Sequence, residues 1–230
     1  MDGKALKVAR QTKNWTQKDA AHALGVTQAY LSMLETGHRA VSNGLARKAL
    51  RVLDFPPTAL PLQSPTGGST SSSGHDYGSD LAALGYPSFA YLRAKVRRNP
   101  AAVLLAALNE PNLDSRVAEG LPWLALTYVD MDWDWLVRNA KVSDVQNRLG
   151  FAVSLASEVA EGRNDTNGTE KLGGCLEVLE RARLAQEDTF CHDSMTQTER
   201  TWLRQHRSRT ARHWNLLTDL EGKHLGYAHS

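Results

Sequence analysis

The chain has 230 residues, of which 41% are hydrophobic, and its formal net charge is +2. This length suits two domains with apolar cores, and the composition excludes global disorder. Two cysteines, Cys175 and Cys191, are too few for a disulfide framework and favour a reducing compartment. Because no apolar run is long enough for a signal peptide or a bilayer span, we expect a cytoplasmic protein without a membrane partner.

Charge is distributed unevenly along the sequence. Residues 1–53 contain nine basic and three acidic side chains, a net charge of +6, whereas the remaining residues sum to −4. A basic module on a mildly acidic body is typical of a protein in which only one part meets phosphate.

Residues 16–37 have the pattern of two short helices joined by a tight turn. Thr16 and Asp19 have the spacing of a capping box, which satisfies end amides of a helix. Gly25 can adopt a positive φ at little cost, and Thr27 can cap the second helix. The segment therefore predicts a helix-turn-helix, whose second helix can enter the major groove of DNA.

Composition divides the chain into three parts. Apolar residues recur at helical spacing up to Val52, and Phe55-Pro56-Pro57 ends the pattern, so we expect a first domain over residues 1–62. Residues 63–80 are rich in Ser, Thr and Gly and predict a flexible linker. Residues 81–230 predict a helical bundle that binds a partner or an effector or forms a dimer.

The helices of the bundle can be placed by their start signals. Prolines open three of the predicted helices, at Pro87, Pro100 and Pro122. Ser143–Gln146 has the shape of a capping box and opens another. A last helix is expected from Thr196, with one apolar stripe formed by Trp202, Leu203, Trp214 and Leu217. Because no alternating strand pattern is evident, the predicted fold is all-α, with an irregular helical bundle after the linker.

The first 60 residues resemble the XRE/Cro-type phage-repressor helix-turn-helix family. The residues that carry the resemblance are Arg10, Thr16, Gln17, Ala21, Gly25, Val26, Thr27, Gln28, Leu31, Glu35 and Gly37. The sequence departs from the family at Ala20, where a larger aliphatic residue is usual and Trp15 is a candidate to fill the space. The resemblance implies a structural ion pair between Arg10 and Glu35.

The resemblance also implies a set of DNA-binding residues. In it, Gln17 touches phosphate, and the residues that face the groove are Thr27, Gln28, Ala29, Ser32 and Met33. Glutamine can bind adenine bidentately, and alanine and methionine offer apolar contact to thymine methyls, which makes Gln28 the first candidate for base readout. Arg39 and Asn43 are placed to hold the DNA backbone, and Lys18 and Arg47 are weaker candidates.

Two other clusters contain chemically active residue types. Asp130, Asp132 and Asp134 could converge on a metal ion, but the glycine and the carboxylate of a calcium loop are missing, and Asp132 is better interpreted as a helix cap. Cys191-His192-Asp193 is contiguous, and consecutive residues cannot all converge on one centre. We therefore expect no catalytic residue, no metal and no cofactor.

The predicted bundle also offers candidate partner-binding residues. They are Trp133, Trp135, Arg204 and Arg207, from the acidic tryptophan-rich segment and the arginine-rich last helix. The alternative for the last helix is a core of aromatic residues whose arginines pair with acids on the preceding helix, such as Glu177, Glu180, Glu187 and Asp188.

These features predict a sequence-specific regulator, a repressor of bacterial or phage type, that binds double-stranded DNA. Because one module reads only a few base pairs, we expect a homodimer on a near-palindromic operator. A role as the antitoxin and autorepressor of a toxin-antitoxin pair is a variant of this hypothesis. Two alternatives remain open: an interaction scaffold whose helix-turn-helix no longer binds DNA, and a metal-dependent enzyme that uses Asp130, Asp132 and Asp134.

Overall fold

The computed structural model describes residues 3–53, 55–62, 75–94 and 97–228. The chain folds as two compact units, Met1–Gln63 and Ser64–Ser230, and each is described by itself. Helices dominate the described residues, so the predicted all-α class is confirmed. The one sheet within them pairs two strands of two residues each, which the sequence did not predict. No described helix combines the length and the apolar character needed to cross a membrane.

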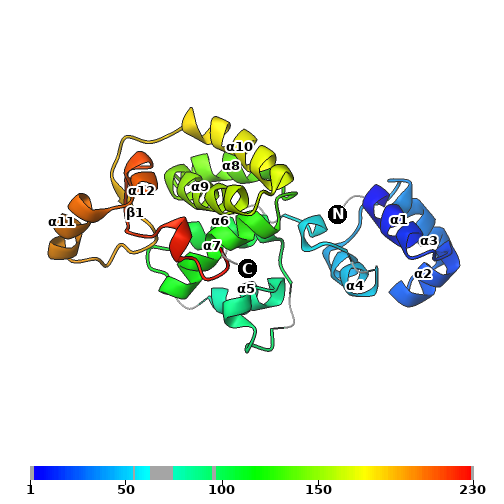
Figure 1. Cartoon of the computed structure of the whole chain (residues 1–230). Helices are drawn as coiled ribbons and strands as arrows, with labels where there is room; N and C mark the ends of the chain where they lie inside the picture. Colours follow the sequence, from blue (N-terminus) through cyan, green and yellow to red (C-terminus); the bar gives the residue numbers. More distant parts are fainter. Residues whose placement is uncertain (1–2, 54, 63–74, 95–96, 229–230) are drawn as a thin grey trace. The chain divides into compact units, whose positions relative to one another are not determined.

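Four α-helices build the N-terminal unit, followed by one short 3-10 helix (Figure 1). Their bounds are α1 (Gly3–Thr12), α2 (Gln17–Leu24), α3 (Gln28–Glu35), α4 (Asn43–Leu53) and η1 (Pro57–Ala59). The apolar faces of these helices share one core, in which Leu6, Leu31 and Leu34 are fully buried. Ala20 is also fully buried, and the half-buried ring of Trp15 packs against the same core, at the departure from the family pattern.

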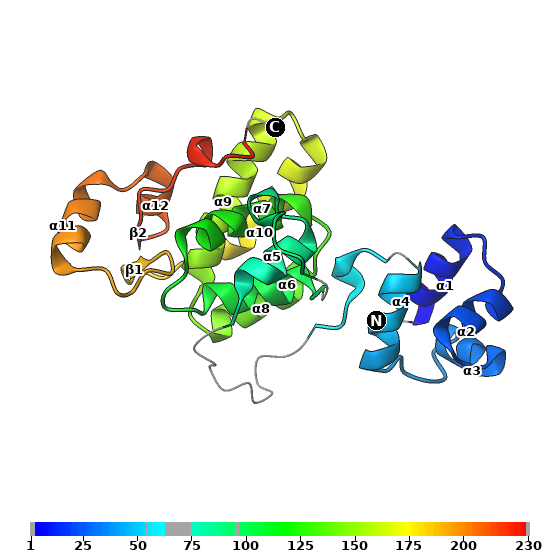
Figure 2. The same ribbon diagram turned by 90° about the horizontal axis from the view of Figure 1, so that it is seen from below.

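The C-terminal unit is larger and is centred on α9 (Figures 1 and 2). Its helices are α5 (Tyr77–Leu84), η2 (Pro87–Phe89), α6 (Pro100–Leu108), α7 (Ser115–Thr127), α8 (Trp133–Val142), α9 (Gln146–Gly162), α10 (Thr166–Glu180), α11 (Gln197–His206), α12 (Arg209–His213) and η3 (Gly222–His224). The strands β1 (Asp188–Thr189) and β2 (Leu216–Leu217) pair in parallel. Helix α9 packs most extensively against α7 and α10, and most of its residues are buried.

Close packing joins α9 to the segment after α12. A Cβ built on Gly150 would lie 2.4 Å from a ring carbon of Trp214, so only glycine lets this indole approach the helix. Trp214 is buried, and its Nε1 donates a hydrogen bond to Ser154 Oγ at 2.8 Å. The indole therefore packs closely against α9 at Gly150 and is fixed by a polar contact through its nitrogen.

Some helix starts predicted for this unit are confirmed and others are wrong. Pro100 opens α6, and Thr196 forms a capping box with Glu199. Pro87 opens only a 3-10 turn. Pro122 lies inside α7, because that helix already begins at Ser115 behind its cap, Asp114.

Three further predictions require correction. No side chain caps α9, which begins after Val145. The last helix does not continue from Thr196 to Leu217, because Ser208 caps the separate helix α12. Trp202 is consequently not part of an apolar stripe, and its side chain is 51% exposed. The linker does not extend to Asp80, because Asp76 caps α5 and Tyr77 and Asp80 are buried in the unit. Residues 63–74 of that predicted linker lie outside the described residues.

Candidate nucleic-acid interface

The turn between α2 and α3 is built from three local signals. Thr16 and Asp19 form a reciprocal capping box at the start of α2. Gly25 ends the helix with φ 68°, a left-handed conformation that favours glycine, and its N–H bonds back to Ala21 and His22. Thr27 Oγ1 accepts a hydrogen bond from the N–H of Tyr30 and caps α3. These caps fix the angle at which α3 leaves the turn.

The two faces of α3 differ sharply in burial. Leu31 and Leu34 are fully buried in the core of the unit. Gln28 and Ala29 are exposed, Met33 is 38% exposed, and Ser32 is half-buried. The outward face thus carries an amide, a hydroxyl and two apolar side chains, a set able to contact base edges and thymine methyls.

A buried ion pair holds α3 against α1. Arg10 Nε donates to Glu35 Oε1 at 2.7 Å and Arg10 Nη2 donates to Glu35 Oε2 at 3.0 Å, a bidentate pair. Arg10 Nη1 also donates to the carbonyl of Trp15 at 2.8 Å. The one guanidinium therefore joins the end of α3 to the chain just before α2.

Glu35 has a second donor, which the sequence did not predict. Gln17 Nε2 donates to Glu35 Oε2 at 2.9 Å. Burial raises the pKa of Glu35, but the hydrogen bonds from Arg10 and Gln17 and the charge of Arg10 outweigh it, so the net shift is downward. The side-chain nitrogen of Gln17 is thus engaged with Glu35. The group of Gln17 that can bind a phosphate is its backbone N–H, which lies in the first turn of α2.

The predicted backbone-contacting residues lie on the segments before and after α3. The N–H of Arg39 donates to the carbonyl of Met33 at 3.1 Å, which turns the chain back at the end of α3. Asn43 is the first residue of α4, and the side chains of Lys18, Arg39 and Asn43 are all exposed. Amides at a helix start and cations beside a groove-facing helix are the groups that hold DNA phosphates.

The two clusters of chemically active residue types, around Asp132 and around Cys191, have other partners in the structure. Asp132 caps α8 by accepting from the N–H of Trp135 at 2.9 Å, as predicted, and Asp130 pairs with Lys171. Across the described parts of the chain, no three His, Cys, Asp or Glu side chains are grouped so that they could hold a metal ion.

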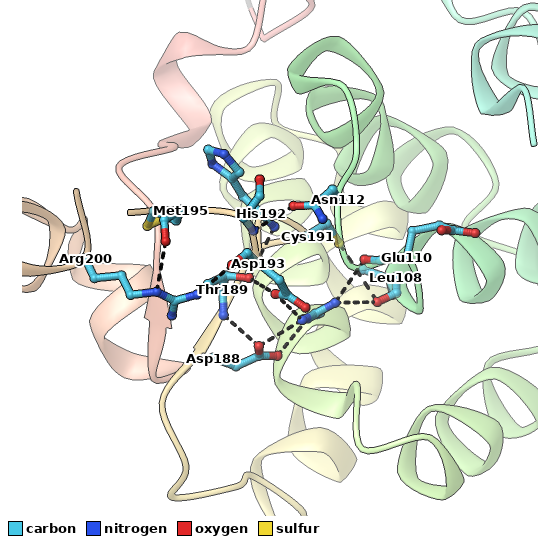
Figure 3. A network of polar contacts seen from close by, with 12 residues as sticks. Leu108, Glu110, Asn112, Asp188, Thr189, Cys191, His192, Asp193, Met195 and Arg200 are labelled. Carbon is cyan, nitrogen blue, oxygen red and sulfur yellow. Dashed lines mark hydrogen bonds and ion pairs between the residues drawn. The ribbon is translucent and has the colours of Figure 1, made fainter. Parts of the chain in front are cut away.

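Cys191, His192 and Asp193 belong to a polar network centred on buried Arg148 (Figure 3). Arg148 makes a bidentate pair with Asp188, at 2.7 and 2.8 Å, and also donates to Asp193 and to the carbonyls of Leu108 and Glu110. Burial raises the pKa of the Cys191 thiol to about 12, so it is protonated at neutral pH and a poor nucleophile. His192 points away from the carboxylates of Asp188 and Asp193 (Figure 3).

The predicted partner-binding residues are engaged to different degrees. Trp133 and Trp135 are half-buried, and Trp133 Nε1 donates to the carbonyl of Val129 at 2.9 Å. Arg204 pairs with Glu187 at 2.8 Å, one of the acids expected to neutralise the last helix. Arg207 is half-buried. Trp202, which the sequence placed in an apolar stripe rather than among the binding residues, has an exposed ring that stacks on His206 with centroids 4.3 Å apart.

Comparison with known families agrees with this geometry. Residues 6–60 match the model described as helix-turn-helix, of the XRE family, a segment of the chain that coincides with the N-terminal unit. No curated protein and no solved structure matches the chain. The N-terminal segment is thus an XRE-type helix-turn-helix domain, the domain of a DNA-binding transcription regulator.

Proposed function

We propose that the protein is a sequence-specific repressor that reads double-stranded DNA with α3. The observation that carries the proposal is the outward face of α3, where Gln28, Ala29 and Met33 are exposed while the opposite face is fixed in the core. The net charge of +6 over residues 1–53 supports phosphate binding by the same unit. The proposal assigns the chain a role in binding and none in catalysis.

The proposed active form is a homodimer on a near-palindromic operator. A single recognition helix contacts only a few base pairs, so useful specificity needs two copies, on half-sites roughly 34–36 Å apart. Within this dimer, Thr27, Gln28, Ala29, Ser32 and Met33 face bases. Gln17, Lys18, Arg39 and Asn43 contact the backbone.

Selection of bound sequences from a random DNA pool, followed by titration of the selected site, tests the proposal. Gln28→Ala is expected to weaken the selected site by about 1–3 kcal/mol while leaving unrelated DNA unaffected. Arg39→Ala is expected to weaken all sequences alike and to flatten the salt dependence of binding. Equal losses on selected and unrelated DNA for Gln28→Ala would rule out base readout.

Lys13→Ala is the matched control for Arg39→Ala. Lys13 is also an exposed cation of the N-terminal unit, but its Nζ is engaged: it donates to the carbonyl of Val52, in α4, and lies 5.7 Å from the ring centroid of Trp15. A salt slope that changes equally in both variants would show that only overall charge matters. An interaction scaffold without DNA binding predicts no salt-sensitive association in any variant.

A second candidate function, that of an antitoxin, is favoured by the surface of α11. This helix projects from one end of the C-terminal unit in both views (Figures 1 and 2) and presents Trp202 and His206. Exposed tryptophans flanked by arginines are typical anchors of protein interfaces. In this candidate function the partner is a toxin with an acidic surface, whose charge the cations of α11 and α12 would complement.

Co-expression with the product of the adjacent gene tests the antitoxin role. The chain is expected to relieve growth arrest caused by that product, and Trp202→Ala is expected to abolish the relief. Val142→Ala removes another exposed apolar side chain of the same unit and is the control. Absence of growth arrest, or full relief by Trp202→Ala, would contradict this role.

A further inference from the structure

The C-terminal unit contains a cavity of about 540 Å³ that the DNA-binding role does not use. It lies between the start of α5, the segment after η2 and the connection from α6 to α7. Its walls include Tyr77, Phe89, Tyr91, Glu110, Asp114 and Arg116. Volumes of this size are usual for sites that enclose a small organic molecule.

Aromatic rings form one wall of the cavity. The rings of Phe89 and Tyr91 have centroids 6.3 Å apart at an interplanar angle of 59°. Phe89 is buried beneath the wall, whereas Tyr91 is 68% exposed, an unusual state for so large a ring. Aromatic faces carry negative electrostatic potential and attract organic cations.

Carboxylates dominate the charge of the cavity. Glu110 is half-buried and accepts a hydrogen bond from Tyr77 Oη at 2.8 Å. Asp76 and Asp114 also line the cavity, where they cap α5 and α7. The lining residues therefore include three carboxylates but one guanidinium, that of Arg116. The imidazole of His75, which also lines the cavity, pairs with Asp80, a residue outside the lining.

The main chain at and after Glu110 is fixed by hydrogen bonds. Arg148 Nη1 donates to the main-chain carbonyl of Glu110 at 3.2 Å. The next residues are bound to the segment around Cys191: the N–H of Leu113 donates to the Cys191 carbonyl, and Asn112 Oδ1 accepts from the N–H of Ser194. The carboxylate is therefore held in place before a ligand arrives, which lowers the entropic cost of binding.

We propose that this cavity binds a small organic cation, an ammonium group carried on an apolar or aromatic body. Glu110 is the counter-ion of the ammonium group, and the exposed ring of Tyr91, which packs on Phe89, covers the body. The acidic walls discriminate against anions, and the aromatic wall discriminates against inorganic cations. The site belongs to the C-terminal unit and does not depend on DNA recognition by the N-terminal unit.

Isothermal titration of the full chain with phenethylammonium chloride tests the proposal. Saturable binding with one site per chain is expected. The isosteric neutral alcohol, 2-phenylethanol, and the anion phenylacetate are expected to bind at least about tenfold more weakly, because they lack the charge that pairs with Glu110. No saturable binding of the cation, or equal binding of the alcohol, overturns the proposal.

Variants locate the site. Glu110→Gln keeps an oxygen that can accept from Tyr77 but removes the charge, and is expected to weaken phenethylammonium binding about tenfold. Tyr91→Ala removes an exposed ring without disturbing the core and is expected to weaken binding about threefold to tenfold. Glu170→Gln, an exposed carboxylate of α10, is the matched control and should leave binding unchanged. Unchanged binding in Glu110→Gln and Tyr91→Ala places the cation elsewhere and refutes the assignment.

Discussion

Each unit of the molecule is fastened by one buried arginine, but the acids that these arginines bind differ in exposure. The side chain of Arg10 is 10% exposed and that of Arg148 is 8% exposed. The carboxylate of Glu35 is only 2% exposed, whereas the side chains of Asp188 and Asp193 are 32% and 43% exposed. Loss of Arg10 would strand a buried charge, whereas loss of Arg148 would leave carboxylates that water can reach. The partner, more than the arginine, decides the cost of breaking such a pair.

The largest effect is expected for Arg10→Met, which should destabilise the N-terminal unit by about 3–5 kcal/mol because Glu35 keeps only Gln17 as a donor. Hydrogen exchange of the full chain should show lost protection in α1 and α3, together with weaker DNA binding. Arg51→Met, at the exposed end of α4, is the control. Protection in α3 equal to that of the unaltered chain would contradict the role assigned to the pair.

Arg148→Met is expected to destabilise the C-terminal unit by less, about 1–3 kcal/mol, because the aspartates can rehydrate and the main cost is two carbonyls that lose a donor. Urea unfolding followed by tryptophan fluorescence reports this unit, which contains five of the six tryptophans. The exposed Arg138→Met is the control. A loss larger than that of Arg10→Met would reverse the comparison between the two units.

A substitution at Gly150, near Arg148 in α9, tests the contribution of packing to the stability of the C-terminal unit without changing a charge. Gly150→Ala would force a Cβ into the ring of Trp214 and is expected to cost about 1–2 kcal/mol in the same urea assay, despite the better helix propensity of alanine. Gly173→Ala on α10 meets nothing within 4 Å and is expected to stabilise the unit by up to about 1 kcal/mol. Equal signs for the two variants would show that Trp214 moves aside freely.

The smallest expected effect is a loss of stability of the N-terminal unit at acidic pH. The pKa of Glu35 lies below the ordinary value of 4.5 in the folded unit, so its ionised form stabilises the fold above pH 4.5. That contribution is lost as the pH falls through the lowered pKa. The protection of α3 amides, measured relative to their intrinsic exchange rates at each pH, should therefore fall below pH 4.5, and Glu35→Gln should remove this dependence. An identical acid profile in both proteins would show that other carboxylates control the response.

Local signals made the N-terminal unit predictable. The capping box of Thr16 and Asp19 lies within four residues, and a spacing of this length can be identified directly in the sequence. The outward face of α3 follows from helical periodicity once its start is known. The Arg10–Glu35 pair, 25 residues apart, was accessible only through the family resemblance.

Long-range contacts made the C-terminal unit unpredictable in detail. Arg148 meets Asp188 across 40 residues, and nothing in the local sequence distinguishes it from an exposed arginine. The position of Trp202 was wrong because a continuous helix was assumed through Arg207 and Ser208, where the chain in fact ends one helix and caps another. The Tyr77–Glu110 contact and its cavity likewise unite segments 33 residues apart.

The bond between Tyr227 and Glu119 sets an order of events during synthesis. Tyr227 Oη donates to the carbonyl of Glu119 at 3.0 Å across 108 residues, and its buried ring meets that of Tyr86. Since the ribosome releases the chain from its amino end, the helix-turn-helix can fold long before this closing contact forms. Protease digestion of stalled ribosomal complexes should therefore reveal early protection of the N-terminal unit while the larger unit is still incomplete.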